Sequence, residues 1–223
     1  MKKNLFTILI FIAAAIVVLM IFQLKNNSIS PLHNSPTPQP TPTATSTRFS
    51  DTTITQNKSF VLPISNALSR VTKKPFGIYI TPKTSPVQPE KFSGYHTGAD
   101  FEVFDNEKNV DVPIFAICTG KLAMKKYASG YGGVAVQECT TNNNPVTIVY
   151  GHLRLSSVKP SAGDNIKAGE QIAVLGTGYS NETDGERKHL HLGIHKGSST
   201  NILGYVQKQS DLSQWIDPLT LLK

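Results

Sequence analysis

The feature that most limits the fold of this chain is a series of short apolar runs that begins after residue 59. Most runs are rich in Val, Ile, Phe or Tyr, and Gly, Pro, Asn or Asp often separates them, as between strands joined by turns. The runs are FGIYI, ADFEVF, VPIFAIC, GKLAMKKY, GGVAVQEC, VTIVYGHL, QIAVLG and HLHLGIH. Residues 59–223 are therefore predicted to form a mainly β domain, with an antiparallel, barrel-like sheet that is closed or nearly closed around one core.

Helices are expected to contribute little to this domain. No stretch of about twelve residues or more has apolar side chains at helical spacing. The 16 glycines and 14 prolines also suit turn-rich β-structure better than a helical bundle. One short helix is predicted in residues 210–222, where Ser210 or Asp211 can cap the first turn.

The N-terminus contains an apolar stretch from Leu5 to Phe22 that only Thr7 interrupts. These 18 residues approach the roughly 20 that a helix needs to cross a bilayer. They exceed the apolar part of a cleavable signal peptide, and no A-x-A cleavage site follows them. Residues 1–27 are thus predicted to be a transmembrane signal anchor, with a cleaved signal as the alternative.

Residues 28–58 are predicted to be a disordered linker rich in Pro, Thr and Ser. Their repeated Pro-Thr and Pro-Gln steps favour an extended, polyproline-like chain that has no core of its own. The predicted order is anchor, spacer and folded domain. It describes a single-pass membrane protein whose domain lies in the cell wall or periplasm, or a secreted protein if the signal is cleaved.

Charge and cysteine content narrow the possible partners. The net charge is +7, but the chain has no dense Lys/Arg run with interleaved aromatic residues, so no nucleic-acid partner is expected. Cys118 and Cys139 fall in strand-like runs that can be neighbours, and export would permit a disulfide. Sequence alone leaves this bridge open. Neither cysteine belongs to a CxxC pair, which argues against a cysteine-based metal site.

Histidines are concentrated in the run from Lys188 to His195, which reads KHLHLGIH. Alternate residues of a strand point to opposite faces, so the two leucines and the isoleucine are predicted to face the core. His189, His191 and His195 then share the other face. A polar, solvent-facing strand side is the simple interpretation, but a pair of imidazoles two residues apart is also typical of metal or acid–base chemistry.

Two further segments carry the remaining histidines that follow the linker. GYHTGADFEVF places His96 four residues before Asp100, in what the glycine and the following β-run indicate is a loop that enters a strand. Imidazole and carboxylate are both zinc ligands, although Asp100 alone could simply cap a turn. His152 ends the apolar run VTIVYGHL, where a side chain can project over the rim of the sheet.

The segments HTGAD, VYGHL and HLHLGIH, in this order, resemble the lysostaphin-type zinc metallo-endopeptidases, which cut the peptide part of bacterial peptidoglycan. The resemblance extends over VPIFAICTGKLAMKKYASGYGGVAVQE and VKPSAGDNIKAGEQIAVLGTGYS, and it covers about residues 94–195. It implies the family's mostly antiparallel sheet with a groove over the metal. It also implies one Zn²⁺ per chain bound by His96, Asp100 and His191, with His152 and His189 as the catalytic histidines.

The resemblance implies an exported zinc endopeptidase that hydrolyses stem peptides or cross-bridges of peptidoglycan with zinc-activated water. Three protein ligands and an open fourth position are typical of catalytic zinc, whereas structural sites have four. The alternative is a non-catalytic module that binds the wall or regulates a hydrolase. Such modules typically lose metal ligands, whereas all five key residues are present here, which favours the enzyme. The catalytic domain is expected to be monomeric.

The chain departs from the family pattern in the segment SNETDGERK, before the HxH motif. This segment is longer and more charged than the family's Gly-rich link, which predicts a different groove wall and leaves the cleaved bond open. His195 has no certain counterpart in the family and is predicted to lie at the rim. The resemblance also does not decide which of His152 and His189 is the general base.

Overall fold

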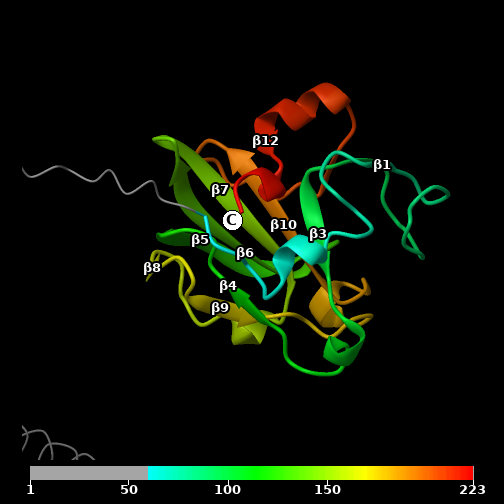
Figure 1. Cartoon of the computed structure of the whole chain (residues 1–223), viewed down its shortest axis with the longest axis horizontal. Coiled ribbons are helices and arrows are strands. Elements are labelled where there is room, and N and C mark those ends of the chain that lie inside the picture. The colour runs from blue at the N-terminus through cyan, green and yellow to red at the C-terminus, as the bar shows by residue number, and fades with distance from the viewer. Residues whose placement is uncertain (1–59, 223) are drawn as a thin grey trace, which may run out of the picture. The chain divides into compact units, whose positions relative to one another are not determined.

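The computed structural model describes residues 60–222, and the described part is mainly β, as predicted (Figure 1). Its strands are β1 (Tyr79–Ile80), β2 (Gly94–His96), β3 (Gly98–Glu102), β4 (Pro113–Phe115), β5 (Gly120–Ala128), β6 (Gly132–Thr141), β7 (Asn144–Leu153), β8 (Asn165–Ile166), β9 (Gln171–Val174), β10 (His189–Lys196), β11 (Tyr205–Val206) and β12 (Trp215–Ile216). Each of the eight predicted runs overlaps one strand. The predicted anchor (1–27) and linker (28–58) lie outside the described residues.

The main sheet has seven strands, and every pairing between its strands is antiparallel. The hydrogen-bonded order is β12-β10-β7-β6-β5-β8. β3 also pairs with β10, along residues 189–193, whereas β12 pairs with residues 194 and 195 of the same strand. This order begins at β3 and β12 and ends at β8, so the pairing does not close into a barrel. Two smaller sheets, β1-β2-β11 and β4-β9, complete the described strands.

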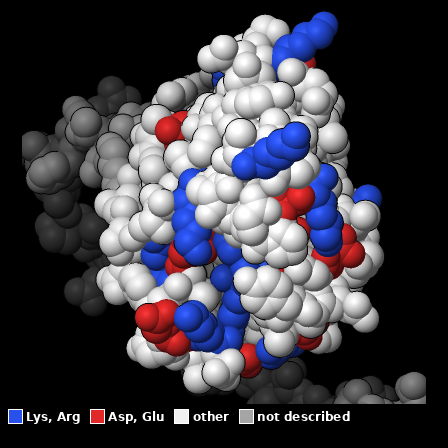
Figure 2. Space-filling view, turned by 90° about the vertical axis from the view of Figure 1, so that its right-hand side faces the viewer, with Lys and Arg blue, Asp and Glu red and all other residues white. Residues whose placement is uncertain are grey.

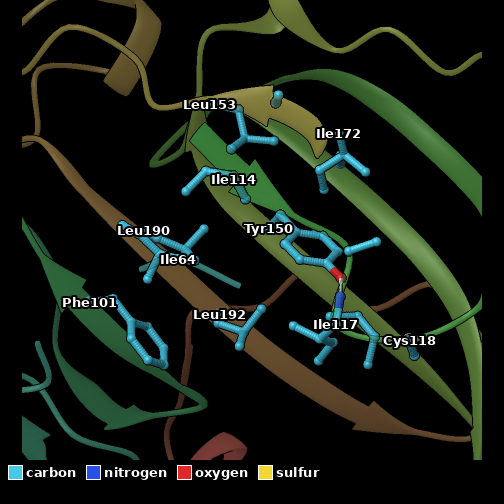
Figure 3. Close-up of a cluster of buried hydrophobic side chains, with 14 of the residues drawn as sticks. Ile64, Phe101, Ile114, Ile117, Cys118, Tyr150, Leu153, Ile172, Leu190 and Leu192 are labelled. Carbon is cyan, nitrogen blue, oxygen red and sulfur yellow. Dashed lines mark hydrogen bonds between the residues drawn. The ribbon is translucent and has the colours of Figure 1, made fainter. Parts of the chain in front are cut away.

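The core of the domain lies against one face of the main sheet. Leu190, Leu192 and Ile194 of β10 are fully buried in it, as the alternation in this strand predicted. Tyr150 of β7 and Phe101 of β3 join them from the neighbouring strands (Figure 3). The histidines of β10 lie on the opposite face of the strand.

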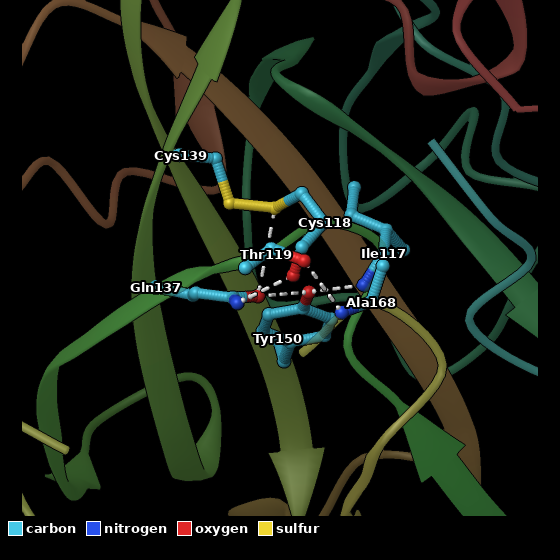
Figure 4. Close-up of a disulfide and its surroundings, with 7 residues drawn as sticks. All are labelled: Ile117, Cys118, Thr119, Gln137, Cys139, Tyr150 and Ala168. Carbon is cyan, nitrogen blue, oxygen red and sulfur yellow. Dashed lines mark hydrogen bonds between the residues drawn. A yellow bond between two sulfur atoms is a disulfide. The ribbon is translucent and has the colours of Figure 1, made fainter. Parts of the chain in front are cut away.

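The hydrogen bonds of the Tyr150 hydroxyl and a disulfide connect the segment after β4 with the main sheet (Figure 4). The Tyr150 hydroxyl accepts a hydrogen bond from the Ile117 N–H (2.9 Å) and donates one to Gln137 Oε1 (2.8 Å). Cys118 and Cys139 form a disulfide with their Cα atoms 6.3 Å apart, which is within the usual range. The bridge that the sequence left open therefore ties the segment after β4 to β6.

The helix predicted in residues 210–222 is corrected by the structure. Two 3₁₀ helices, η5 (Gln209–Gln214) and η6 (Pro218–Thr220), stand there with β12 between them. Trp215 is buried and pairs with His195 of β10, and Pro218 cannot continue a helix because it lacks an N–H. The cap of η6 is Asp217, whose carboxylate accepts the Leu219 N–H, whereas neither Ser210 nor Asp211 is the N-cap of η5.

Four other 3₁₀ helices are short: η1 (Ala67–Ser69), η2 (Asp105–Glu107), η3 (Leu155–Ser157) and η4 (Asn181–Thr183). Within residues 60–222, none of the helices has the length and apolar character that a membrane crossing requires. On the face that Figure 2 shows, lysine and arginine side chains lie among acidic ones.

Candidate metal centre and its histidine neighbours

The five predicted site residues converge on the face of the main sheet opposite the core. His96 ends β2 and Asp100 lies in β3, while His189 and His191 come from β10 and His152 from β7. The register of β3 against β10 places His191 directly opposite Asp100. All five side chains are buried. Strand pairing in the main sheet therefore sets the positions of four of them. His96 belongs to a smaller sheet, but only Thr97 separates its strand β2 from β3.

Three donor atoms lie at the corners of a nearly regular triangle. His96 Nε2 is 3.0 Å from His191 Nδ1, and Asp100 Oδ1 is 3.3 Å from the first of these atoms and 3.2 Å from the second. The three residues form a group that can hold a metal ion. For zinc bonds of about 2.0–2.1 Å, a tetrahedron has edges of about 3.3 Å. The spacing of the donors thus fits one tetrahedral zinc with its fourth position free of protein.

Hydrogen bonds orient two of the imidazoles around this triangle. His96 Nδ1 lies 3.2 Å from the Pro75 carbonyl, to which it donates, so its Nε2 keeps a lone pair for the centre. His191 presents Nδ1 to the centre, and its buried Nε2 has no hydrogen-bond partner within residues 60–222. A Cβ atom at Gly98 would stand 2.8 Å from this Nε2. The glycine therefore makes room for the ring.

Arg187 holds the other oxygen of the Asp100 carboxylate, a contact that the sequence did not reveal. Its Nη2 donates to Asp100 Oδ2 at 2.9 Å, and the same guanidinium binds both oxygens of Glu102. Oδ1 stays directed to the donor triangle. Burial alone would raise the pKa of Asp100, but the charges and hydrogen bonds of the neighbouring histidines hold it well below its usual range.

His152 reaches the site through a β-bulge. In β7, Gly151 pairs with Val134 and Leu153 pairs with Gly133, so His152 is the extra residue between them, and its φ is 60°. Tyr150 and Leu153 both face the core, and simple alternation would send His152 there too. The bulge instead re-aims the side chain, as bulges beside active sites do. The His152 and His189 ring centroids are 4.2 Å apart.

The environment of His152 keeps its imidazole uncharged. Burial, followed by the charge of His189, lowers the pKa of His152 well below its usual value. Its Nδ1 is buried and has no hydrogen-bond partner in the part of the chain that the structure describes. His189 differs in this respect because its Nδ1 donates to the Arg187 carbonyl at 2.9 Å, while its Nε2 lies 3.2 Å from Asp100 Oδ2. Of His152 and His189, His152 is thus the one with a buried nitrogen that has no partner within residues 60–222.

A cavity of about 340 Å³ opens beside the donor triangle. Asp100, His152, His189 and His191 line it, together with residues that sequence reasoning missed: Lys74, Phe92, Tyr131, Glu186, Arg187 and Tyr205. The Tyr131 ring lies between two of the histidines, with centroids 5.5 Å from His152 and 5.2 Å from His191. Two sequence signals concerned these residues: the family-like stretch that contains Tyr131, and the charged segment SNETDGERK, which contains Glu186 and Arg187.

His195 does not take part in this cavity. Its ring packs edge-on against Trp215 at a centroid distance of 4.8 Å, and the residue lies further along β10 than His189 and His191. The residue lies on their face of the strand, as the alternation predicted, but it contributes to the packing of β12.

Comparison with known proteins shows that all five site residues lie in a segment that matches a protein family. Residues 94–202 match the model of Peptidase family M23. Endolysin 2638A of Staphylococcus phage 2638A is 29% identical over 143 residues, which are 56% of this chain and 27% of the endolysin. This chain therefore spans only about a quarter of that relative's length.

Solved structures with a similar domain include two bacterial proteins. The catalytic domain of the antimicrobial peptidase lysostaphin from Staphylococcus simulans is 23% identical, with 66% of this chain and 86% of that chain covered and a TM-score of 0.43. Helicobacter pylori Csd3 is 20% identical, with 75% of this chain and 35% of that chain covered and a TM-score of 0.48. The ordered HxxxD, His and HxH motifs lie inside the segment that matches Peptidase family M23, and the structure brings them together, in agreement with the resemblance of the sequence to the lysostaphin-type peptidases.

Proposed function

We propose that this protein is a zinc endopeptidase that hydrolyses peptide bonds in bacterial peptidoglycan. The observation that carries the proposal is the donor triangle of His96, Asp100 and His191, which has tetrahedral spacing and lies beside a cavity with two further histidines. A site with three protein ligands and an open position is typical of catalytic zinc. When bound, zinc supplies a Lewis acid and lowers the pKa of a water ligand.

The chain's own residues supply positioning and proton transfer. His96, Asp100 and His191 would hold the ion. His152 is uncharged near neutral pH and has a free Nδ1, so it is suited to accept a proton from the attacking water. His189 is held through Nδ1 by the Arg187 carbonyl and lies against His152, where Nε2, when it also carries a proton, would donate a hydrogen bond to the developing oxyanion. Proton return to the leaving amine completes the hydrolysis.

The substrate class rests on the family and on its named members. The motifs resemble those of enzymes that cut the peptide part of peptidoglycan, and the similar proteins include a phage endolysin and the antimicrobial peptidase lysostaphin. The predicted anchor (1–27) and linker (28–58) would hold the domain of residues 59–223 outside the membrane with reach into the wall. Export, anchoring and the zinc itself belong to this proposal.

The test uses the full chain, purified in detergent and incubated with peptidoglycan in the presence or absence of a zinc chelator. New amino groups are measured, and mass spectrometry identifies the freed ends. We expect amine release that the chelator abolishes and added zinc restores. Binding to the wall without release would instead favour the non-catalytic module.

Two variants separate metal binding from proton transfer. His191→Ala is expected to lose both zinc and activity, because it removes a ligand of the donor triangle. His152→Ala is expected to keep zinc and lose activity by about 100-fold or more, the usual contribution of a general base. A His152→Ala variant that cleaves at the parent rate would remove this residue from the mechanism.

A further inference from the structure

Glu186 stands out among the residues that line the cavity because its carboxylate is buried and poorly compensated. The residue is 8% exposed, and it shares the cavity with His152 and His189. Within residues 60–222, no group donates a hydrogen bond to the carboxylate. The Lys91 ammonium lies 3.9 Å away, but it is half-exposed and donates to the Asp184 carbonyl instead.

The other charged side chains around the cavity are matched. Lys74 donates to Glu90 at 2.5 Å and also reaches the Tyr205 hydroxyl at 3.1 Å. Arg187 is bound to Asp100 and Glu102. Because a largely buried carboxylate without a hydrogen bond is costly, and the one ion pair of Glu186 is the long contact with half-exposed Lys91, this carboxylate marks a place where a further positive charge would be favourable. Burial raises the pKa of Glu186, and the charges of the neighbouring His189, Lys74 and Lys91 offset only part of this effect.

The backbone holds Glu186 in this position. Its carbonyl accepts the Tyr179 N–H and the Thr183 hydroxyl, both at 2.7 Å. The turn before it has left-handed conformations at Asp184 (φ 52°) and Gly185 (φ 80°), which direct the chain back to the cavity. This turn lies in the segment SNETDGERK, where the chain departs from the family pattern. The backbone of Glu186 is therefore held in place by a feature of this chain.

We propose that Glu186 binds an ammonium group of the peptide substrate and makes the cavity selective for peptides that carry a primary amine near the cleaved bond. The proposal rests on the proposed peptidase function and adds the substrate class. Aromatic rings of Phe92, Tyr131 and Tyr205 also line the cavity, and such faces attract cations. The amine could belong to the side chain of a diamino acid or to the free N-terminus of a peptide.

The experiment uses the zinc-loaded full chain and a fluorescent stem peptide that contains lysine as its diamino acid and carries the label at its C-terminus. Three further peptides have the lysine side chain acetylated, the N-terminus acetylated, or both. Cleavage is measured as kcat/KM, and binding is measured by fluorescence anisotropy. We expect the peptide that lacks the relevant amine to lose about 10- to 100-fold, the usual effect of a hydrogen-bonded charge. If acetylation of the lysine side chain lowers kcat/KM, the diamino acid supplies the amine; if acetylation of the N-terminus lowers it, the peptide N-terminus does.

Glu186→Gln is the variant that tests the residue, since it keeps the shape and removes the charge. It is expected to abolish the discrimination between free and acetylated peptides while cleavage of the doubly acetylated peptide is retained. Glu138→Gln, on an exposed position of β6, is the matched control and should discriminate as the parent does. The comparison of peptides on the parent chain needs no variant, so it stands even if Glu186→Gln does not fold.

The outcomes separate this inference from the proposed function. If the parent protein cleaves free and acetylated peptides equally, or if Glu186→Gln keeps the full discrimination, the role of Glu186 is refuted and the peptidase stands. If the zinc-loaded protein cleaves none of the peptides, the peptidase proposal fails in this assay. Amine-dependent binding that Glu186→Gln abolishes would then still support the ammonium site, and binding without amine dependence would overturn it.

Discussion

Arg187 offers the sharpest test of how the site is held together, because it is a buried cation between two carboxylates. Its side chain is 7% exposed, and the side chains of Asp100 and Glu102 are 3% and 13% exposed. Arg187→Met keeps the length of the side chain and removes the charge. Asp100 then remains buried without this cation, and the partly buried Glu102 keeps only the half-exposed Lys73 at 3.5 Å; loss of one partner of a buried pair costs about 3–5 kcal/mol. We expect this loss in the free energy of unfolding of the metal-free protein.

Arg154→Met is the matched control, because Arg154 also binds two carboxylates but lies near the surface. Its guanidinium is 2.8 Å from Asp111 and 3.1 Å from Glu182, distances similar to those at Arg187. The exposed fractions are 28% for Arg154 and 61% and 34% for its partners. Water screens such pairs, so the variant should lose about 1 kcal/mol or less.

Urea denaturation of both variants and the parent, followed by circular dichroism, gives the comparison directly. Addition of Glu102→Gln to Arg187→Met should cost less than the sum of the two single changes, because the double variant leaves one buried carboxylate fewer without a partner. The reasoning is refuted if Arg187→Met unfolds within about 1 kcal/mol of the parent, or if the two arginine variants are equally destabilised.

Three further predictions concern the frame around the site. Reduction of the Cys118–Cys139 disulfide, which spans 21 residues, should lower the free energy of unfolding by about 3 kcal/mol. Gly98→Ala should lower zinc content and thermal stability together, because its Cβ would stand 2.4 Å from the Leu192 carbonyl oxygen; a variant with normal zinc content would contradict this. Burial lowers the pKa of His191 from 6.5 to about 4. The unfolded chain therefore takes up the proton first, and His191 alone should cost the metal-free protein ~3 kcal/mol as the pH falls from 6.5 to 4, measured as the difference between the parent and His191→Ala by denaturation at each pH.

The strands could be predicted from the sequence because they depend on short-range patterns, whereas the three residues of the donor triangle are those that the family resemblance implied as ligands. Alternation in β10 separates the leucines from the histidines, and the register with β3 then brings His191 opposite Asp100. The position of His152 did not follow from such a pattern. Alternation assigns it to the core, and only the bulge opposite Gly133 turns it to the site.

Arg187 and Glu186 could not be predicted for a different reason. They precede β10 in a segment without periodicity, so their directions depend on the turn at Asp184 and Gly185 and on distant partners such as Glu102. The final segment shows the same limit. Its apolar residues suit a helix, but Pro218 and the pairing of Trp215 with His195 divide it into two 3₁₀ helices.

The two faces of β10 connect the stability of the domain with the geometry of its candidate metal centre. Leu190, Leu192 and Ile194 bury one face, and His189 and His191 occupy the other. A shift of the strand by one residue would exchange the faces, placing leucines in the cavity and imidazoles in the core. The core therefore excludes the registers that would also dismantle the donor triangle. Because burial of the leucines specifies the same pairing that sets His191 opposite Asp100, the protein can hold this centre in shape before any ion binds.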